Sequence, residues 1–463
     1  MSNDKVDTIV AIATSSGEAG IGIVRLSGPD AVRIVDSLFE AKSRKCLARV
    51  PSHTLHYGWI KDPEKKERIL DEVLVSVMRS PRSYTREDVV EINCHGGPIA
   101  LRAVLDACLS KGARLAEPGE FTKRAFLNGR IDLTQAEAVL DIVRAKTDMA
   151  LSASQAQLKG QLSNRLTSLK EGIIKQQARL EVQIDFPEEE IGEVDFITIK
   201  KELNQILQQL NDLIKTERTG RYLHDGIRVV ICGKPNVGKS SLLNALLQEE
   251  RSIVTPVAGT TRDTIEEILD VKGFPIRIVD TAGILEPRDL VERKAVARSK
   301  QMIRQADLIL LVFDASRPFD EMDKTMMYTV QKKKHIVAVL NKIDLPKRFD
   351  ERKIKGFTKH LVYLSAKKRL NISELEDVLV NSIISSKTIH QESILVTSAR
   401  HREALKKAQK CIAQAIDSLN NNVSLEYICL DLKEAVHYLD EIMGKSVSED
   451  ILDVIFSEFC IGK

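Results

Sequence analysis

The sequence predicts a multidomain protein that combines an N-terminal α+β part, an all-α part and an α/β part. Its 463 residues exceed the roughly 100–200 residues usual for one domain. Short β-type runs alternate with helical stretches in the first quarter of the chain, and apolar residues recur at helical spacing in two later segments. Between those segments lie apolar strands followed by loops or helices, which is typical of a Rossmann-like, mostly parallel sheet.

The composition is that of an ordinary protein with a large core. Hydrophobic residues make up 43% of the chain and charged residues 29%, and the net charge of +3 is too small to indicate a nucleic-acid partner by itself. The cysteines are scattered without metal-binding spacing, which favours a reducing compartment. No apolar run approaches the roughly 20 residues of a membrane span, and Asp4 and Asp7 stand where a targeting peptide lacks acids. We therefore predict a cytoplasmic protein with no membrane association.

The first domain is predicted to cover residues 1–119 with α+β structure. Stretches of helical character separate its predicted strands. These strands are short runs rich in β-branched and aromatic residues: Thr8–Ile12, Ile21–Leu26, His53–Ile60, Val73–Met78 and Val89–Asn93.

A helical domain is predicted in two parts, 120–216 and 385–463. Helical spacing in the first part is carried by Leu133, Ala136, Val139, Leu140, Val143, Thr147 and Ala150. In the second part, apolar residues predict one helix around 405–419 and another over Leu425–Met443, and Ser446 with Glu449 predicts a capping box at the last helix. Each helix has one apolar stripe, so the simplest solution is a single bundle built from both parts. Residues 217–384 are then a domain inserted into that bundle.

The inserted segment opens with a phosphate-binding pattern. The run Ile227–Cys232 leads into G-x-x-x-x-G-K-S, from Gly233 to Ser240, and a helix-forming stretch follows. The glycines let backbone N–H groups turn toward phosphates at the positive end of the new helix. Lys239 is expected to reach the β- and γ-phosphates, and the Ser240 hydroxyl to bind Mg²⁺. The loop therefore predicts a nucleoside-triphosphatase rather than a plain glycine-rich turn.

Two further motifs predict the metal and γ-phosphate contacts. Asp280–Gly283 ends a strand and offers a carboxylate for the Mg²⁺ shell and a backbone N–H for the γ-phosphate. Upstream, Gly259–Asp263 supplies Thr261 as a second Mg²⁺ ligand, in a segment that the γ-phosphate would order.

Two more motifs indicate guanine as the base. Asn341–Asp344 ends another strand, and Asp344 can accept hydrogen bonds from the N1–H and the 2-amino group of guanine. Ser365–Lys367 offers backbone donors to the base carbonyl. We therefore predict a GTPase domain. Its candidate GTP-binding residues are Asn236, Val237, Gly238, Lys239, Ser240, Ser241, Thr255, Thr260, Thr261, Asp280, Thr281, Ala282, Gly283, Asn341, Lys342, Asp344, Ser365, Ala366 and Lys367.

The residue after the motif at 280–283 bears on the mechanism. In many GTPases a glutamine there orients the attacking water, but this chain has Ile284, which has no polar side-chain group. Asn236 carries a side-chain carbonyl suited to a monovalent cation, and we predict a potassium ion held by Asn236 and by backbone carbonyls. The alternative is that Asn236 only caps the loop.

Segments outside the GTPase motifs carry a family resemblance. They are residues 22–28, 84–97 and 118–133 and the tail Phe459–Lys463. With them, the chain resembles the tRNA-modification GTPases of the TrmE/MnmE family from its first strand to its last residue. The tail and the segment 84–97 are specific to that family, whereas the GTPase motifs are shared by many.

The resemblance implies a homodimer whose N-terminal domains bind a tetrahydrofolate derivative such as 5,10-methylene-tetrahydrofolate. With an FAD- and NADH-dependent partner protein, in a heterotetramer or larger assembly, such proteins add a carboxymethylaminomethyl or aminomethyl-type group to the wobble uridine of certain tRNAs. GTP hydrolysis drives a conformational cycle in which the GTPase domains of the dimer approach each other. By motif match, the folate-binding residues are Arg25, Glu87, Arg130 and Lys463.

The resemblance also implies roles for individual residues. Glu292 matches the glutamate that the family uses for hydrolysis, and the alternative is an exposed helix glutamate. Cys460 is expected to line the folate site rather than act as a catalytic thiol, and His95 to be a hydrogen-bonded structural histidine rather than a base. The positions that match the family's potassium site are Asn236, Thr255, Val257 and Thr260.

Two function classes remain open. The leading hypothesis is an enzyme of tRNA wobble-uridine modification, and the rival is a ribosome-assembly GTPase that uses hydrolysis only as a switch. The sequence shows no RNA-binding module, and the N-terminal segments and the tail favour the first class. A helical scaffold with a degenerate nucleotide site is excluded because all the nucleotide motifs are intact.

Overall fold

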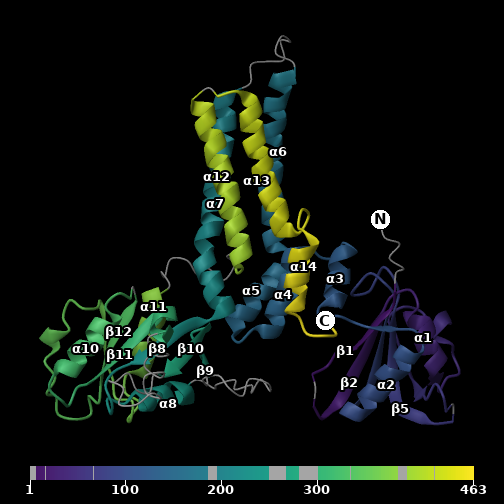
Figure 1. The fold of residues 1–463 in the computed structure, drawn as a ribbon, viewed down its shortest axis with the longest axis horizontal. Coiled ribbons are helices and arrows are strands. Elements are labelled where there is room, and N and C mark those ends of the chain that lie inside the picture. Colours follow the sequence, from purple (N-terminus) through teal and green to yellow (C-terminus); the bar gives the residue numbers. More distant parts are fainter. Residues whose placement is uncertain are drawn as a thin grey trace. The chain divides into compact units, whose positions relative to one another are not determined.

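The computed structural model describes residues 7–15, 17–65, 67–185, 195–249, 267–280, 301–333, 335–383, 394–421 and 423–463. Contacts divide the chain into two compact units. The first comprises Met1–Leu140 together with Asp440–Lys463, and the second comprises Asp141–Leu439. Each unit is described by itself below (Figure 1).

The first unit is built on a seven-stranded sheet in the order β3-β4-β5-β6-β2-β1-β7. All neighbouring strands are antiparallel except β1 and β7, which are parallel. The strands are β1 (Ile9–Ile12), β2 (Ala19–Ser27), β3 (Phe39–Ala41), β4 (Thr54–Lys61), β5 (Ile69–Met78), β6 (Val89–Gly96) and β7 (Arg114–Leu115).

Helices cover one face of this sheet and extend the unit toward the C-terminus. α1 (Ala31–Leu38), η1 (Leu47–Arg49) and α2 (Pro98–Ser110) bury apolar residues against the sheet. α3 (Glu120–Leu127) and the start of α4 (Leu133–Arg144) pack with α14 (Glu449–Ser457), so the last residues of the chain join the N-terminal unit.

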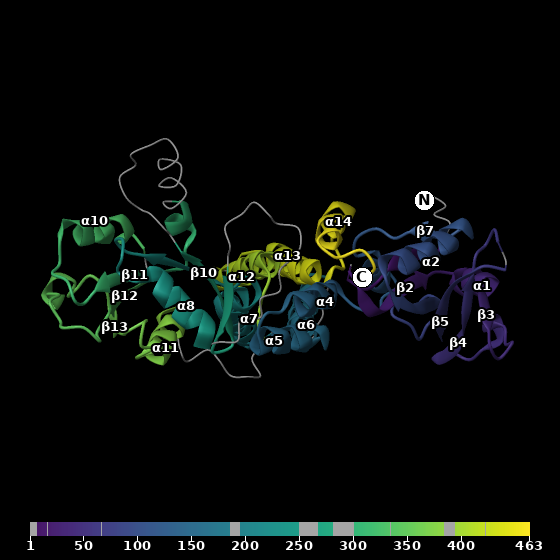
Figure 2. The ribbon, with the colours of Figure 1, turned by 90° about the horizontal axis from the view of Figure 1, so that it is seen from below.

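Long helices dominate one part of the second unit. α6, α7, α12 and α13 lie side by side (Figures 1 and 2), and α5 packs against α6 and α7. Their bounds are α5 (Asp148–Leu158), α6 (Gln161–Asp185), α7 (Phe196–Asp225), α12 (Ala399–Asn420) and α13 (Leu425–Met443). Apolar residues at helical spacing form the buried stripes, as Leu203, Ile206 and Leu210 do in α7. None of the helices within the described ranges is long and apolar enough to cross a membrane.

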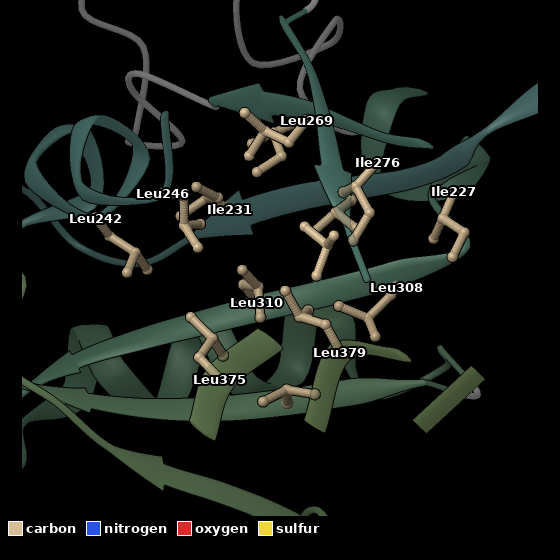
Figure 3. Close-up of a cluster of buried hydrophobic side chains, with 14 of the residues drawn as sticks. Ile227, Ile231, Leu242, Leu246, Leu269, Ile276, Leu308, Leu310, Leu375 and Leu379 are labelled. Atoms are coloured by element: carbon tan, nitrogen blue, oxygen red, sulfur yellow. The ribbon is translucent and has the colours of Figure 1, made fainter. Parts of the chain in front are cut away.

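A six-stranded sheet forms the other part, in the order β13-β12-β11-β8-β10-β9. It is parallel except for the edge strand β9, and helices cover both of its faces, as parallel sheets require. Leu242 and Leu246 of α8 and Leu375 and Leu379 of α11 meet strand residues on one face (Figure 3). The elements are β8 (Ile227–Cys232), α8 (Lys239–Glu249), β9 (Glu267–Val271), β10 (Phe274–Asp280), β11 (Leu308–Asp314), α10 (Glu321–Val330), β12 (Ile336–Asn341), η2 (Glu351–Lys353), β13 (His360–Tyr363) and α11 (Ile372–Ile383).

The chain enters the sheet domain from α7 and returns beside it, and α5 also packs against the sheet at β10. α7 ends at Asp225, and β8 begins two residues later. The returning chain passes directly over α7 at Gly220, where an added Cβ would lie 2.2 Å from the carbonyl oxygen of Val396. The Val396 N–H also donates to Thr216 Oγ1 at 3.2 Å. Entry and exit of the inserted domain therefore run side by side.

The predicted fold class is confirmed: an α+β part, a bundle from two chain segments, and a mostly parallel sheet between those segments. Two local predictions were wrong. Thr147 does not continue a helix but caps α5, since its hydroxyl accepts from the Ala150 N–H at 3.2 Å. The N-cap of α14 is Ser448 rather than Ser446, so Glu449 is the first helical residue and no capping box forms with it.

Candidate functional site

The phosphate loop joins β8 to α8 in a backbone shape that glycine and asparagine adopt most easily. Gly238 and Asn236 have positive φ angles of 98° and 64°. An added Cβ at Gly238 would lie 2.3 Å from Asn341 Nδ2, and one at Gly233 would lie 2.5 Å from the Val312 carbonyl oxygen. Side chains at these glycines would therefore push the loop away from the neighbouring strands.

Lys239 is the first residue of α8, and its ammonium lies over the loop. It donates to the carbonyl oxygens of Gly233 at 3.0 Å and Lys234 at 3.1 Å. The first turn of α8 directs backbone N–H groups toward the same place. A cation and a helix N-terminus on one loop form a site with the chemistry to bind phosphate, and Ser240 lies in the first turn of that helix.

Asn341, the last residue of β12, ties three segments of the site together. Its Nδ2 donates to the Val237 carbonyl oxygen at 2.9 Å, and its Oδ1 accepts from the Ala366 N–H at 3.0 Å. The side chain is buried, at 2% exposed. The phosphate loop, β12 and the loop at 365–367 therefore keep a fixed relation to one another.

Asp344 and Ser365 form the part of the site that is predicted to read the base. Ser365 Oγ donates to Asp344 Oδ1 at 2.6 Å, and this hydrogen bond is the main cause that lowers the pKa of Asp344. The carboxylate is thus charged at neutral pH and held in one orientation. A charged acceptor there can pair with the N1–H and 2-amino group of guanine.

Sequence reasoning missed Asp314, which ends β11 and is 2% exposed. Its Oδ2 accepts from the Lys342 ammonium at 2.7 Å, and its Oδ1 accepts from Ser316. Burial raises the pKa of Asp314, but these donors outweigh burial, so the pKa lies below its usual range. Its position at the carboxyl end of a buried parallel strand was the signal that could have found it.

Several predicted site residues lie outside the described residues, and their placement stays a prediction. They are Thr255, Val257, Thr260, Thr261, Thr281, Ala282, Gly283 and Glu292. Asp280 is described only as the last residue of β10, opposite Ile231 of β8.

In the first unit, two predicted folate residues share one aromatic side chain. The Arg25 guanidinium lies 5.9 Å and the Arg130 guanidinium 4.8 Å from the centroid of the Tyr84 ring. Arg25 also donates to the Gly462 carbonyl oxygen at 3.1 Å, next to Lys463, and its Nε lies 2.8 Å from Glu91 Oε1. This cluster can bind an anionic, planar ligand.

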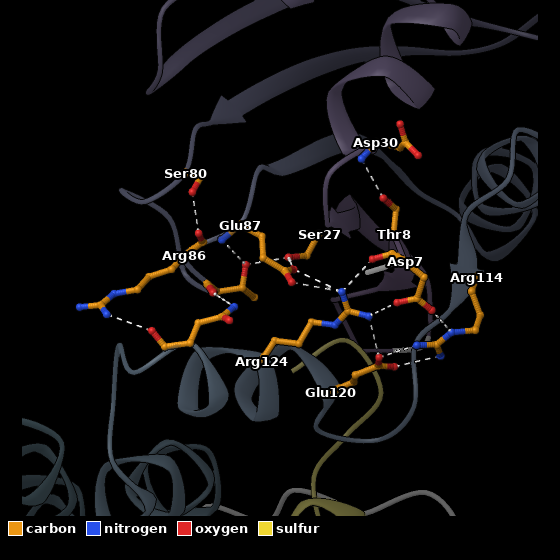
Figure 4. A network of polar contacts seen from close by, with 12 residues as sticks. Asp7, Thr8, Ser27, Asp30, Ser80, Arg86, Glu87, Arg114, Glu120 and Arg124 are labelled. Atoms are coloured by element: carbon orange, nitrogen blue, oxygen red, sulfur yellow. Dashed lines mark hydrogen bonds and ion pairs between the residues drawn. The ribbon is translucent and has the colours of Figure 1, made fainter. Parts of the chain in front are cut away.

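Glu87, the third predicted folate residue, belongs to an ionic network in the same unit (Figure 4). Its Oε2 accepts from Ser27 Oγ at 2.6 Å, and its Oε1 lies 3.3 Å from Nη1 of Arg124. Arg124 also contacts Asp7 and Glu120, and Glu120 pairs with Arg114. The side chains of Arg124, Glu87 and Glu120 are only 10–15% exposed, so the protein itself supplies partners for the Glu87 carboxylate.

The remaining two candidates differ in their surroundings. Cys460 is exposed, and its carbonyl oxygen accepts from the Gly119 N–H at 3.4 Å, which holds the tail against the start of α3. His95 lies in β6, and its Nδ1 is 2.6 Å from Asp71 Oδ1. That contact favours the structural reading of His95.

Comparison with known proteins decides the family. The model of the MnmE helical domain matches residues 133–460, and the model of the GTP-binding protein TrmE N-terminus matches residues 8–130. The chain belongs to the MnmE family. Curated tRNA modification GTPases named MnmE align along it from end to end. Those of Thermoanaerobacter pseudethanolicus and Clostridioides difficile are 47% and 45% identical over 459 residues, 99% of this chain and 99% of each relative.

Among solved structures, a single-residue variant of Aquifex aeolicus Era bound to GDP·AlF4⁻ is 29% identical. That alignment covers 40% of this chain and 66% of the Era chain, with a TM-score of 0.28. The two MnmE family models, in contrast, together cover the phosphate loop and the cluster of Arg25, Arg130 and Tyr84, here called the arginine–tyrosine cluster.

Proposed function

We propose that this MnmE-family chain is the GTP-hydrolysing subunit of a complex that modifies the wobble uridine of certain tRNAs. The complex adds a carboxymethylaminomethyl or aminomethyl-type group with a tetrahydrofolate one-carbon donor and an FAD-dependent partner protein. The observation that carries this proposal is the meeting of Arg25 and Arg130 on Tyr84 beside the C-terminal tail. A GTPase that acted only as a switch has no need of such a cluster in the same chain.

GTP binding uses the described part of the inserted domain. Lys239 exchanges its two loop carbonyl partners for the β- and γ-phosphates, while backbone N–H groups at the start of α8 receive the remaining phosphate oxygens. Asp344, held by Ser365, selects guanine. Ser240 and Thr261 would hold Mg²⁺, which neutralises charge on the phosphates.

Hydrolysis needs a substitute for the glutamine that Ile284 replaces. We propose that a potassium ion, held by Asn236, Thr255, Val257 and Thr260, offsets the developing negative charge, and that Glu292 orients the attacking water. The Asn236 backbone fits such a role, because its αL conformation is fixed by the Lys342 contact to its carbonyl oxygen. In a homodimer, two such domains would approach each other in the GTP state and separate after hydrolysis.

The folate would lie at the arginine–tyrosine cluster. Arg25, Arg130 and Lys463 have the charge to meet the glutamate carboxylates of the cofactor, and Glu87 can pair with the donor edge of a pterin. Arg25 and Arg130 fit this role, because both guanidinium groups lie against Tyr84 and Arg25 contacts Gly462, the residue before Lys463. Glu87 fits only if it shares its carboxylate with Ser27 and Arg124. When bound, the folate supplies the one-carbon unit.

Calorimetric binding of 5-formyl-tetrahydrofolate to the full chain tests this proposal. Arg130→Met and a variant lacking Lys463 should each weaken binding by about tenfold or more, the effect of losing one charge-assisted contact. Arg33→Met is the matched control, because the Arg33 side chain is 72% exposed and its ion pair is with the neighbouring Asp30. Binding that is absent from the unaltered chain would return it to the ribosome-assembly class.

A second experiment measures the modified tRNA. Cells that lack their own copy of this enzyme, complemented with the full chain or with Arg130→Met, should differ in the wobble-uridine modification of their tRNAs, measured by mass spectrometry. Restoration by the full chain alone supports a folate-dependent enzyme. Equal restoration by both forms would show that the arginine–tyrosine cluster is not needed for the modification.

A further inference from the structure

Lys234, the first variable residue of the phosphate loop, is buried in the GTPase sheet domain. Its side chain is 8% exposed, and its ammonium lies 2.7 Å from Asp320 Oδ2 and 2.8 Å from Asp323 Oδ2. Both carboxylates stand at the start of α10, more than 80 residues further along the chain. The phosphate loop is thus attached to a helix on the opposite side of β11 from its own α8.

Hydrogen bonds at the start of α10 hold the two carboxylates independently of Lys234. Asp320 caps α10 and accepts from the N–H groups of Met322 and Asp323 at 3.0 and 3.1 Å. Asp323 returns the contact, since its Oδ2 accepts from the Asp320 N–H at 3.2 Å. The Asp323 side chain is 3% exposed, and burial raises its pKa. A reciprocal capping box therefore presents a rigid pair of oxygens to the lysine.

The backbone of Lys234 leads to the phosphate-binding lysine. The Lys239 ammonium rests on the carbonyl oxygens of Gly233 and Lys234. Gly233 in turn lies against β11, where a Cβ would be 2.5 Å from the Val312 carbonyl oxygen. One residue thus holds α10 with its side chain and the Lys239 ammonium with its carbonyl oxygen.

We propose that Lys234 is a positioning residue for nucleotide binding. By pairing with Asp320 and Asp323 it fixes the Gly233–Lys234 turn, and the fixed turn holds Lys239 and the loop N–H groups where the triphosphate binds. The position of α10 is thereby coupled to the position of the phosphate loop. The inference rests on the GTP-binding role proposed above.

Variants separate this role from simple stabilisation. Lys234→Met alone leaves Asp323 buried without its cation and endangers folding. The double variant Lys234→Met with Asp323→Asn removes the two buried charges and keeps the shape, and the remaining Asp320 is 51% exposed to water. It should therefore fold with a melting temperature near that of the unaltered protein. The conservative variant Lys234→Arg keeps a positive charge at this position. Lys324→Met is the control on the same helix, because the ion pair of Lys324 is with the exposed Glu321 at 3.7 Å.

The first measurement is dissociation of a fluorescent GDP analogue and steady-state GTP hydrolysis. The double variant should release the analogue about tenfold faster and raise KM more than it lowers kcat, whereas Lys234→Arg and Lys324→Met stay within about twofold of the unaltered protein. A double variant with unchanged release and KM would overturn the proposal, and so would equal losses in Lys324→Met.

A second measurement needs no nucleotide. Backbone amides of residues 233–239 should exchange hydrogen faster in the nucleotide-free double variant than in the unaltered protein, while those of β12 keep their rate. Failure of the unaltered protein to bind GTP would count against the proposed function but not against the role of Lys234. Unchanged exchange in the loop would count against the role of Lys234.

Discussion

The Lys342 ammonium donates to the carbonyl oxygen of Asn236 at 2.7 Å. The same ammonium lies 2.7 Å from Asp314 Oδ2. One side chain of the base-reading segment thus supports the phosphate loop at the residue whose φ is 64°. The segment proposed to read the base and the phosphate loop therefore belong to one hydrogen-bonded assembly.

The first prediction concerns this assembly. Lys342→Met should lower the free energy of unfolding by about 3 kcal/mol, because it leaves the Asp314 carboxylate, 1% exposed, without its main cation. Adding Asp314→Asn should recover most of that loss but not the affinity for GDP. Urea unfolding and GDP titration measure the two effects, and a double variant with full GDP affinity would contradict the assembly.

Base selection gives the second prediction. Asp344→Asn should weaken GTP binding by about 10–100-fold, since each hydrogen bond to a charged group contributes about 1.5–3 kcal/mol. The amide offers a donor to the 2-oxo group of xanthine, so the affinity for xanthosine triphosphate should rise. Competition against a fluorescent nucleotide measures both, and unchanged GTP affinity would show that Asp344 does not contact the base.

The cation proposal gives the third prediction. GTP hydrolysis should be faster in potassium chloride than in sodium chloride of equal ionic strength. Asn236→Gly should abolish the difference, because glycine keeps the αL backbone without strain but lacks the side-chain carbonyl. Equal rates of the unaltered protein in both salts would eliminate the potassium site.

The fourth prediction concerns the ionic network of Figure 4. Arg124→Met should lower the free energy of unfolding by about 3–5 kcal/mol, because it takes the cation from the mostly buried Glu87 and leaves Glu120 with Arg114 alone. Urea unfolding of both proteins measures the loss, and unchanged stability of Arg124→Met would contradict it. Arg33→Met, at an exposed pair, should leave the free energy of unfolding nearly unchanged.

The fifth prediction concerns pH. His224 lies 3.0 Å from Asp141 Oδ1 and 2.7 Å from Asp225 Oδ1, and these hydrogen bonds raise its pKa to about 10. The folded protein holds this proton more tightly than the unfolded chain, whose histidine pKa is about 6.5. The stabilisation is therefore complete below about pH 6.5 and is lost as the pH rises through about 10. His224→Gln should flatten the fall in urea stability between about pH 7 and 10, and an equally steep fall in both proteins would place the effect elsewhere.

Much of the fold follows from patterns within short stretches of sequence. The predicted helix Leu425–Met443 has the bounds of α13, and the predicted strands of the first domain correspond to β1, β2, β4, β5 and β6. Local choices between two hydroxyl residues were less predictable. Ser446 and Ser448 are both good caps, and their spacing in the sequence does not show that α14 begins after Ser448.

The candidate site also contains some residues that were predictable from the sequence and others that were not. The phosphate loop is one continuous motif, so the residues around Lys239 were predictable from spacing. Lys234 and Asp314 were missed because their partners lie 86 and 28 residues away, and no periodicity links such distant positions. Tyr84 was missed because an aromatic residue between two arginines is recognisable only after folding. The assignment of Glu292 stays a prediction.

The contact of Gly220 with Val396 brings the chain segments before and after the GTPase domain next to each other. The chain leaves and rejoins the helices at one point, so everything between could be cut out and the gap closed by a short bridge without unthreading a helix. A module whose two chain connections lie next to each other can be gained, lost or exchanged as a whole during evolution, provided that its packing against α5 is rebuilt. Protein engineers could use the same two residues as the graft point for a different nucleotide switch.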